Sequence, residues 1–376
     1  MKRLLQNMLL AVMAILLTLG VAELVLHVIK PVYDFRDRSL LFSSPVFKEY
    51  SGGAIRYFPK TTIREVAIYN GKLEYDVIYP TNNLGFIDTK DYVRKADARS
   101  CYAFVGDSFT AGVNGGTPWV PKLRNDLAGR EVYNFGVCGA GFNHFYLLMH
   151  DMKDKVKITH IAIVAITDDF YRSYWHSFEN DGMISFCSEN YPHKQCLPKP
   201  VAGVIPLNAT KEEVRAISRS TYKEIRRLTD EENLARGYKA RLEALLYDDS
   251  IIYYYARVLL DSRKRQRSYD NIDFALGSLR KIRAEYPQAE IHLIHLPQKY
   301  EIMTKNYSIN IAEQVKQSGV KYFPALEKCN WSLDMFFERD GHPNSTGYDN
   351  IAACVSGYLF GNETVVAPKD AVMRKP

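Results

Sequence analysis

Two short segments of this chain carry residue types that together could perform nucleophilic chemistry. The first is Gly106-Asp107-Ser108, which follows an apolar run and precedes residues able to begin a helix. This pattern predicts a serine hydroxyl at the carboxyl end of a strand, where open α/β sheets bind ligands. Backbone N–H groups at the helix start would face any negative charge that develops there. The alternative is an ordinary strand-to-helix cap, because Asp and Ser are both common cap residues.

The second segment is Asp340-Gly341-His342-Pro343-Asn344, near the C-terminus. A serine hydroxyl is inert near neutral pH unless a base removes its proton, and histidine titrates in the right range. The histidine needs an acceptor on its other ring nitrogen, and Asp340 lies two residues before it. We therefore predict Ser108 as nucleophile, His342 as its base and Asp340 as the residue that orients the base. The alternative for His342 is a histidine in a surface loop.

The sequence around these segments predicts a parallel α/β sheet. From Cys101 onward, short apolar runs alternate with helical stretches, and continuous apolar strands are typical of sheets covered on both faces. The expected strands are Tyr102–Val105, Glu131–Phe135, Ile161–Ile166, Ile291–Leu296 and Lys321–Pro324.

Two further regions flank and interrupt this sheet. Residues 31–96 are expected to form a β-rich, extracytoplasmic lead-in with a hairpin around Asn70-Gly71, a pair that favours the turns matching strand twist. An insertion spans residues 170–270, with 170–207 rich in loops and 210–267 largely helical, starting from a capping box at Thr210 and Glu213. The basic run at residues 263–267 is either a solvated helix end or a contact with acidic glycan or lipid headgroups.

The N-terminal segment predicts a single membrane contact. Lys2 and Arg3 precede an almost wholly apolar stretch that continues to Ile29, which is long enough to span a bilayer. It is either an uncleaved signal anchor, which we favour, or a signal peptide cleaved near Gly20 and Ala22. The anchor places the domain outside the cytoplasm, in the periplasm or at the cell surface. The expected division is 1–30 anchor, 31–96 lead-in, 97–365 hydrolase domain with its insertion, and 366–376 tail.

Composition excludes few functions, and the cysteines agree with an oxidising compartment. The net charge of +6 over 376 residues is mild, so no nucleic-acid partner is expected. Among six cysteines, Cys187 with Cys196 and Cys329 with Cys354 could form bridges in an oxidising compartment. Cys101 and Cys138 are expected as thiols. No His/Cys spacing indicates a metal site, and none is expected.

At these residues the chain resembles the GDSL/SGNH hydrolase superfamily. Gly106-Asp107-Ser108 is similar to the first block of that superfamily, and Asn134–Gly139 is similar to the second. Asp340–Asn344, with Gly347, is similar to the last block. The resemblance covers residues of about 100–170 and 290–358.

The resemblance implies fold and chemistry together. The fold would be α/β, a three-layer α/β/α flavodoxin-like sandwich with a five-stranded parallel sheet in the order 2-1-3-4-5. The activity would be ester hydrolysis or acyl transfer through an acyl-serine, with no metal or organic cofactor and with Ser108 and Gly139 as oxyanion donors. The chain resembles membrane-anchored esterases and acyltransferases of envelope glycans, which implies an acylated glycan as substrate and leaves a membrane-bound acyl-transfer partner open.

Two positions depart from the pattern. Many members place the aspartate three residues before the histidine, where this chain has Arg339; the spacing of Asp340 is similar to that of the envelope-glycan relatives, and Glu338 is the alternative orienting residue. Asp168 stands where the superfamily has an asparagine that donates to the oxyanion, and an ionised carboxylate only accepts hydrogen bonds. Either Asp168 is protonated, or Asn143 or Thr167 donates instead, or the site is a weak hydrolase that serves binding or transfer.

Residues near these blocks are candidates to contact substrate. They are Asp107, His144, Tyr171 and Arg172, with Tyr174 and Trp175 as a further rim. The alternative for His144 and the aromatic residues is packing under the insertion. The leading hypothesis is an anchored enzyme acting on acyl groups of surface glycans. The alternatives are an esterase of lipids or small esters, and a glycan-binding or assembly protein that keeps the fold.

Overall fold

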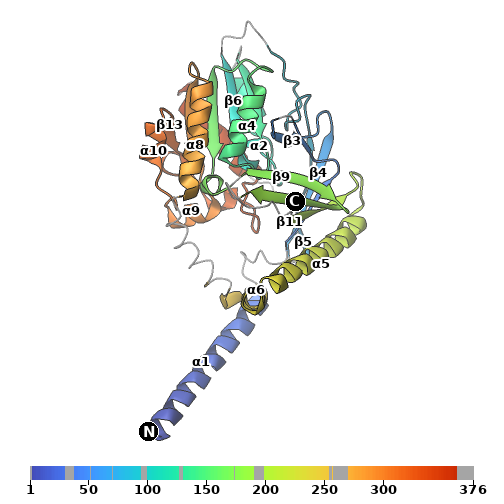
Figure 1. The fold of residues 1–376 in the computed structure, drawn as a ribbon, viewed down its shortest axis with the longest axis vertical. Coiled ribbons are helices and arrows are strands. Elements are labelled where there is room, and N and C mark those ends of the chain that lie inside the picture. Colours follow the sequence, from blue (N-terminus) through green and yellow to red (C-terminus); the bar gives the residue numbers. More distant parts are fainter. Residues whose placement is uncertain are drawn as a thin grey trace, which may run out of the picture.

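The computed structural model describes residues 2–29, 38–50, 52–69, 71–94, 100–126, 130–172, 174–189, 199–253, 256 and 270–361. Five parallel strands form the sheet expected from the apolar runs (Figure 1), in the order β7-β6-β8-β12-β13. This is the predicted 2-1-3-4-5 order, and each strand begins and ends within one residue of its predicted bounds. The strands are β6 (Cys101–Gly106), β7 (Glu131–Gly136), β8 (His160–Ala165), β12 (Glu290–His295) and β13 (Lys321–Pro324).

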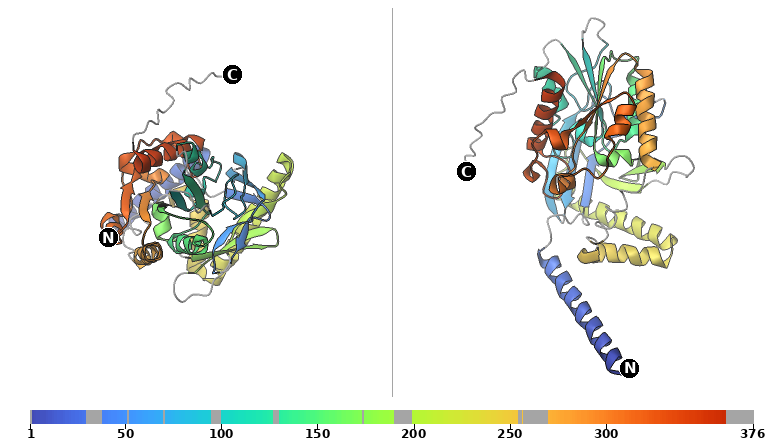
Figure 2. Two further views of the ribbon diagram at one scale, coloured as in Figure 1. Left: turned by 90° about the horizontal axis from the view of Figure 1, so that it is seen from above. Right: turned by 90° about the vertical axis from the view of Figure 1, so that its left-hand side faces the viewer.

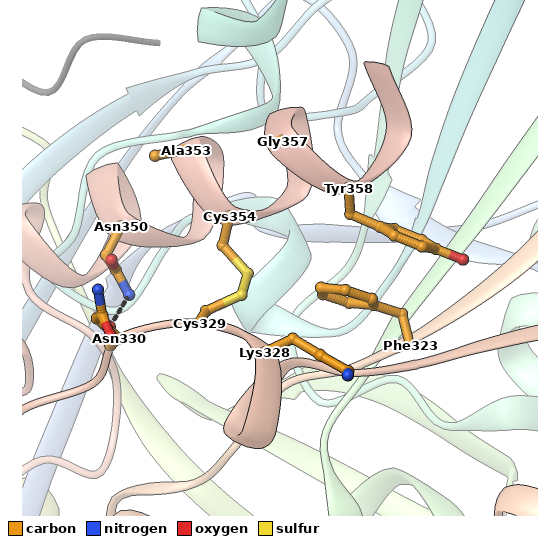
Figure 3. Close-up of a pocket in the computed structure, with 9 residues that line it drawn as sticks. All are labelled: Phe323, Lys328, Cys329, Asn330, Asn350, Ala353, Cys354, Gly357 and Tyr358. Carbon is orange, nitrogen blue, oxygen red and sulfur yellow. Dashed lines mark hydrogen bonds between the residues drawn. A yellow bond between two sulfur atoms is a disulfide. The ribbon is translucent and has the colours of Figure 1, made fainter. Parts of the chain in front are cut away.

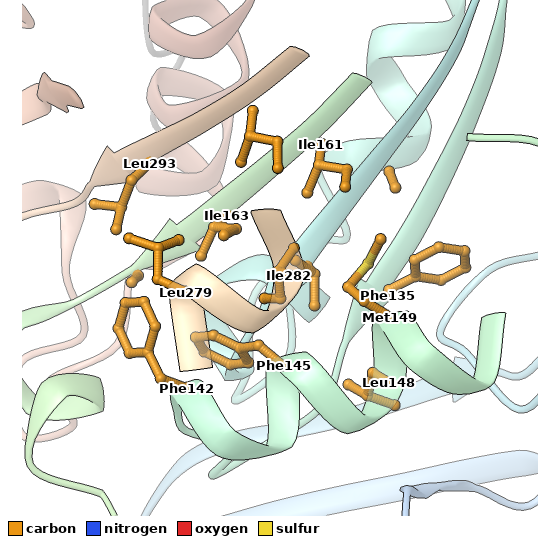
Figure 4. Packing of buried hydrophobic residues seen from close by; sticks show 14 of the residues in the cluster. Phe135, Phe142, Phe145, Leu148, Met149, Ile161, Ile163, Leu279, Ile282 and Leu293 are labelled. Atoms are coloured by element: carbon orange, nitrogen blue, oxygen red, sulfur yellow. The ribbon is translucent and has the colours of Figure 1, made fainter. Parts of the chain in front are cut away.

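Helices cover both faces of this sheet. On one face, α4 (Phe142–Met152) and α8 (Asp270–Glu285) pack through aromatic and aliphatic side chains such as Phe145 and Leu279 (Figure 4). On the other face, α12 (Ser345–Phe360) packs with Trp119 and its neighbours. The smaller helices are α2 (Ser108–Ala111), η1 (Val120–Lys122), α3 (Leu123–Asp126), η2 (Thr167–Phe170), α9 (Lys299–Thr304), α10 (Ala312–Gln317), α11 (Ala325–Lys328) and η3 (Leu333–Met335).

A second, six-stranded sheet unites the lead-in with the insertion. Its order is β5-β4-β1-β11-β10-β9, and β1 pairs in parallel with β11 across the two regions. The hairpin of β4 and β5 forms as predicted, with Gly71 at a φ of 72° in its turn. The expectation of a loop-rich 170–207 is wrong, because three strands fall within it. The strands are β1 (Arg38–Ser43), β4 (Thr62–Tyr69), β5 (Lys72–Pro80), β9 (Tyr174–Asn180), β10 (Met183–Glu189) and β11 (Lys199–Ile205), while β2 (Phe47–Glu49) pairs with β3 (Ile55–Tyr57).

The helical part of the insertion begins at the expected cap. The backbone N–H of Thr210 donates to Glu213 Oε2 at 2.7 Å, and that of Glu213 donates to Thr210 Oγ1 at 3.2 Å. The helices that follow are α5 (Lys211–Ala235) and α6 (Tyr238–Asp249). The basic run at residues 263–267 lies outside the described residues.

The N-terminal helix α1 (Lys2–Ile29) projects away from the two sheets (Figures 1 and 2). Its stretch Gln6–Ile29 is long and apolar enough to cross a membrane, a property that signal sequences share. Its apolar side chains, such as Leu17 and Val28, are exposed.

One of the two expected disulfides lies in the described part of the chain. Cys329, at the end of α11, is bonded to Cys354 of α12, beside an open surface pocket that Phe323 and Tyr358 also line (Figure 3). Cys101 and Cys138 are thiols that form no disulfide within the described residues, as predicted. Cys196, the expected partner of Cys187, lies outside the described residues.

Candidate active site

Ser108 lies where the central strand β6 passes into α2. Asp107 caps this short helix, because its carboxylate accepts from the N–H of Phe109 at 2.8 Å. Gly106 is required there, since a Cβ would lie 2.0 Å from Thr110 Oγ1 and 2.1 Å from the carbonyl oxygen of Val164. The serine is therefore held at the carboxyl edge of the sheet, with only 2% of its surface exposed.

His342 and Asp340 meet this serine as the sequence predicts. Ser108 Oγ lies 2.9 Å from His342 Nε2, and His342 Nδ1 lies 2.5 Å from Asp340 Oδ1. The backbone N–H of His342 donates to the same Oδ1 at 3.1 Å. With Nδ1 donating to the carboxylate, Nε2 is the ring nitrogen that can accept the serine proton. Glu338, the alternative orienting residue, is exposed, and Asp340 takes that place.

The second sheet holds the other oxygen of Asp340, which the sequence did not indicate. The hydroxyl of Tyr69 donates to Asp340 Oδ2 at 2.8 Å, and that of Tyr75 donates at 3.3 Å. Burial by itself raises the pKa of Asp340, but His342, Arg38 and Tyr69 outweigh it and hold that pKa well below its ordinary value. The carboxylate therefore stays ionised beside the histidine. The only signal in the sequence is that the β4–β5 hairpin contains several tyrosines, at positions 69, 75 and 79.

A buried acid lies behind these tyrosines. Glu65 is 1% exposed, and its Oε2 accepts from the N–H of Asn114 at 2.9 Å. The amide of Asn114 donates in turn to the hydroxyl of Tyr75 at 3.3 Å. Burial, together with the nearby charge of Asp340, raises the pKa of Glu65 to about 8. Glu65 is therefore mostly a neutral acid near pH 7.

Asp107 and Arg172 form an ion pair next to the serine. Arg172 Nη1 donates to Asp107 Oδ2 at 2.9 Å, to Asp169 Oδ1 at 2.6 Å and to the carbonyl oxygen of Ala140 at 3.1 Å. Burial, together with the charge of Asp107, raises the pKa of Asp169 well above its ordinary value. The expectation that Asp107 contacts substrate is wrong, because its side chain is fully buried and serves as the cap. Arg172 is part-exposed, so its contact with substrate stays a prediction.

Two other residues that were expected to contact substrate, His144 and Tyr171, pack against the rest of the protein. His144 is fully buried, and its Nε2 donates to the carbonyl oxygen of Ile55 at 2.8 Å, so its expected role at the pocket is wrong. Tyr171 is half-buried and packs against the core between the sheet and α4. The side chains of Tyr174 and Trp175 lie outside the described residues.

The oxyanion side of the site is built from three turns. Gly139 follows β7 with a φ of 77°, and Asn143 stands half-buried in the first turn of α4. Thr167 is not the substitute donor, because its hydroxyl donates to Glu301 Oε1 at 2.6 Å. Asp168 is partly buried, and its Oδ2 accepts from Gln298 Nε2 at 3.0 Å. No group of three or more His, Cys, Asp or Glu residues within the described ranges could hold a metal ion.

We expect Glu65→Gln to change how stability depends on pH. In the folded chain the pKa of Glu65 is about 8, against an ordinary 4.5, so its contribution is fully present below pH 4.5 and is lost as pH rises to about 8. Glutamine keeps an acceptor for Asn114 and does not ionise. At pH 9 the variant should therefore need more urea to unfold than the parent. Its free energy of unfolding should be higher by about a few kcal/mol.

The measurement is urea unfolding of both chains at pH 5, 7 and 9. Glu327→Gln, at an exposed glutamate, is the control and should leave the pH dependence unchanged. Parallel stability curves for the parent and Glu65→Gln would contradict a buried, neutral Glu65.

Comparison with known proteins agrees with this geometry. The model of the family of GDSL-like lipases and acylhydrolases matches residues 102–355, which hold Ser108, Asp340 and His342 and the parallel sheet from the second residue of β6 onward. A search of curated proteins found no match to the chain. Because the family match covers more than half of its length, this chain belongs to the GDSL-like lipase/acylhydrolase family and is an SGNH-type ester hydrolase.

Proposed function

We propose that this enzyme removes or transfers small O-acyl groups, acetyl foremost, on cell-surface glycans. The observation that carries the chemistry is the line of contacts from Ser108 Oγ through the ring of His342 to the buried Asp340, at 2.9 and 2.5 Å. The glycan as acceptor is supported by the resemblance to envelope-glycan enzymes. The apolar helix α1 supports a place at a membrane.

In the first half-reaction, Ser108 Oγ attacks the carbonyl carbon of the acetyl ester. Its proton passes to His342 Nε2, and Asp340 stabilises the imidazolium that results. The tetrahedral intermediate then collapses, the bond to the sugar oxygen breaks, and His342 returns the proton to that oxygen. The products are a free sugar hydroxyl and an acetyl-Ser108 ester.

In the second half-reaction, water or another sugar hydroxyl attacks the acetyl-serine. His342 takes the proton of the attacking oxygen and gives it back to Ser108 Oγ as the acyl bond breaks. Water yields acetate, and a sugar hydroxyl yields a new acetyl ester, so hydrolysis and transfer share one intermediate.

The backbone N–H groups of Ser108 and Gly139 are proposed to hold the oxyanion, with Asn143 as the side-chain donor. Asn143 is favoured because Thr167 is engaged with Glu301 and Asp168 accepts from Gln298. Arg172 forms ion pairs with Asp107 and Asp169 beside Ser108, and its positive charge lowers the repulsion between these side chains and a developing oxyanion.

The orientation of the fold supports a substrate at the membrane surface. α9, which follows the carboxyl end of β12, and the start of α12 lie at the end of the domain nearest α1 (Figures 1 and 2). Ser108 lies at this carboxyl edge. Lys2 and Arg3 favour a cytoplasmic N-terminus, with the domain on the outer side.

The test uses the full chain with p-nitrophenyl acetate and octanoate as donors and chitopentaose as acceptor. We expect acetate to be the better donor and an acetylated oligosaccharide to appear by mass spectrometry. Ser108→Ala should lower turnover by about 10⁴ or more, because the acyl-enzyme cannot form. A preference for octanoate without transfer would favour a lipid or small-ester esterase, and no turnover or phosphonate labelling at Ser108 would favour a binding protein.

We expect Tyr69→Phe to lower kcat by about tenfold, because a hydrogen bond to a charged group contributes about 1.5–3 kcal/mol. Loss of this donor leaves the negative charge of Asp340 less stabilised. A proton on Asp340, or on a group beside it, is then held more tightly. The acidic limb of the kcat/KM profile should therefore move to higher pH. Tyr286→Phe is the control, since its buried hydroxyl donates to the carbonyl oxygen of Met149 at 2.6 Å, away from the site. An unshifted pH profile for Tyr69→Phe would show that the tyrosine only packs.

A pair of variants identifies the side-chain donor to the oxyanion. Asn143→Ala should lower kcat by about 10²–10³, the loss expected when one such donor is removed. Asp168→Asn should change kcat much less, because the asparagine oxygen can still accept from Gln298. A large gain in turnover from Asp168→Asn would instead show that the natural site lacks a donor at that position.

A further inference from the structure

Helix α1 and the helical insertion meet at a part-buried contact around Glu23. Glu23, within the apolar helix α1, accepts from the N–H of Ile251 at 2.5 Å, from the N–H of Ile252 at 3.1 Å and from the hydroxyl of Ser250 at 3.0 Å. Ile251 itself is 1% exposed. These contacts fix the residues just after α6 against the C-terminal part of α1.

The position of Glu23 gives the depth of this contact in a membrane. Glu23 stands six residues before the end of α1 at Ile29, which is about 9 Å along a helix. Helices that lie in a membrane interface bury their apolar face about 5–10 Å into the boundary between headgroups and acyl chains. If α1 spans the bilayer to Ile29, the residues following α6 lie at that boundary.

α6 presents an apolar stripe beside this contact. Tyr238, Leu242 and Leu246 are spaced four residues apart and so share a face, and they are 82%, 44% and 40% exposed. α6 lies on the side of α5 nearest α1 and crosses the direction of α1 (Figures 1 and 2). The last turns of α1 are exposed as well, at Leu24, Val28 and Ile29. Exposed apolar side chains of α6 therefore stand beside those of the last turns of α1, the helix proposed to cross the membrane.

We propose that α6 lies in the outer interface of the bilayer that α1 spans, with Tyr238, Leu242 and Leu246 among the lipid headgroups and upper acyl chains. The occupant of the stripe is lipid because of its continuity with α1. Electrostatic attraction has a minor role, since α6 carries two basic and three acidic residues. The helix then fixes the height and tilt of the catalytic domain, whose active-site edge faces the same membrane.

This inference rests on α1 being retained in the membrane, the location given in the proposed function, and is independent of the reaction catalysed. The test uses the full chain in phosphatidylcholine nanodiscs with Leu242→Trp or Leu246→Trp as fluorescent reporters. Lys211→Trp is the matched control, because this exposed residue begins α5, about 37 Å along that helix from the end next to α6. The unmodified chain gives the background of its three tryptophans.

We expect blue-shifted emission from tryptophan at 242 and 246, and loss of that emission with brominated lipids. Bromine near the headgroups should quench more than bromine near the chain ends. Tryptophan at 211 should show neither effect. Equal emission and quenching at 242, 246 and 211 would overturn the proposal, and would leave the stripe to a protein partner or to solvent.

Failure of the chain to co-elute with nanodiscs would overturn the proposal too, because α1 would not be a retained anchor. Turnover of p-nitrophenyl acetate by the same samples reports separately on the proposed function. An active enzyme with no lipid contact at α6 would contradict only the proposed position of α6 in the membrane interface.

Discussion

The arrangement of this molecule depends on one buried carboxylate, that of Asp340. A charge removed from water is costly unless its oxygens are paired and hydrogen-bonded. Here Oδ1 faces the ring and backbone of His342, while Oδ2 accepts from Tyr69 and Tyr75. One oxygen thus faces the histidine, which stands in the loop between η3 and α12 and reaches the serine that follows β6. The other oxygen is held by tyrosines of the six-stranded sheet.

The six-stranded sheet is consequently part of the site's support. Its strands come from the lead-in and from the insertion, joined where β1 pairs with β11. On β4, the guanidinium of Arg64 forms two hydrogen bonds with Asp76 of β5, at 2.8 and 2.7 Å, and one with the carbonyl oxygen of Ala209 at 2.6 Å. Ala209 immediately precedes the cap of α5. A chain of direct contacts therefore runs from Asp340 through β4 to the helices beside α1, so the end of the domain next to α1 and the site share one framework.

The sequence predicted those parts of the structure that depend on local pattern. The five parallel strands are continuous apolar runs, and Ser108, Asp340 and His342 stand in short segments whose residue types explain their chemistry. β9 and β10 were missed, because residues 174–189 mix polar and aromatic residues without clear alternation and owe their pairing to a sheet completed by distant strands. The contact between Tyr69 and Asp340 joins residues 271 positions apart, and no local pattern encodes it. His144 was misjudged for the same reason, since its acceptor is the backbone of Ile55.

The surroundings of Ser108 also bear on the choice between water and a sugar hydroxyl in the proposed second half-reaction. Asp107 and Asp169 are buried next to the serine and share Arg172, and Asp168 stands where the resemblance to the superfamily implies an amide. Because Asp168 accepts from Gln298 and offers no amide donor, the proposed oxyanion hole has one possible donor fewer on that side, which would slow both attacks on the acyl-serine. Slow attack lengthens the life of the acyl-enzyme. A sugar hydroxyl bound beside that ester gains the advantage of high effective concentration, which water, already abundant, does not. A reduced oxyanion hole is therefore compatible with acyl transfer, provided that the acceptor is held close to Ser108.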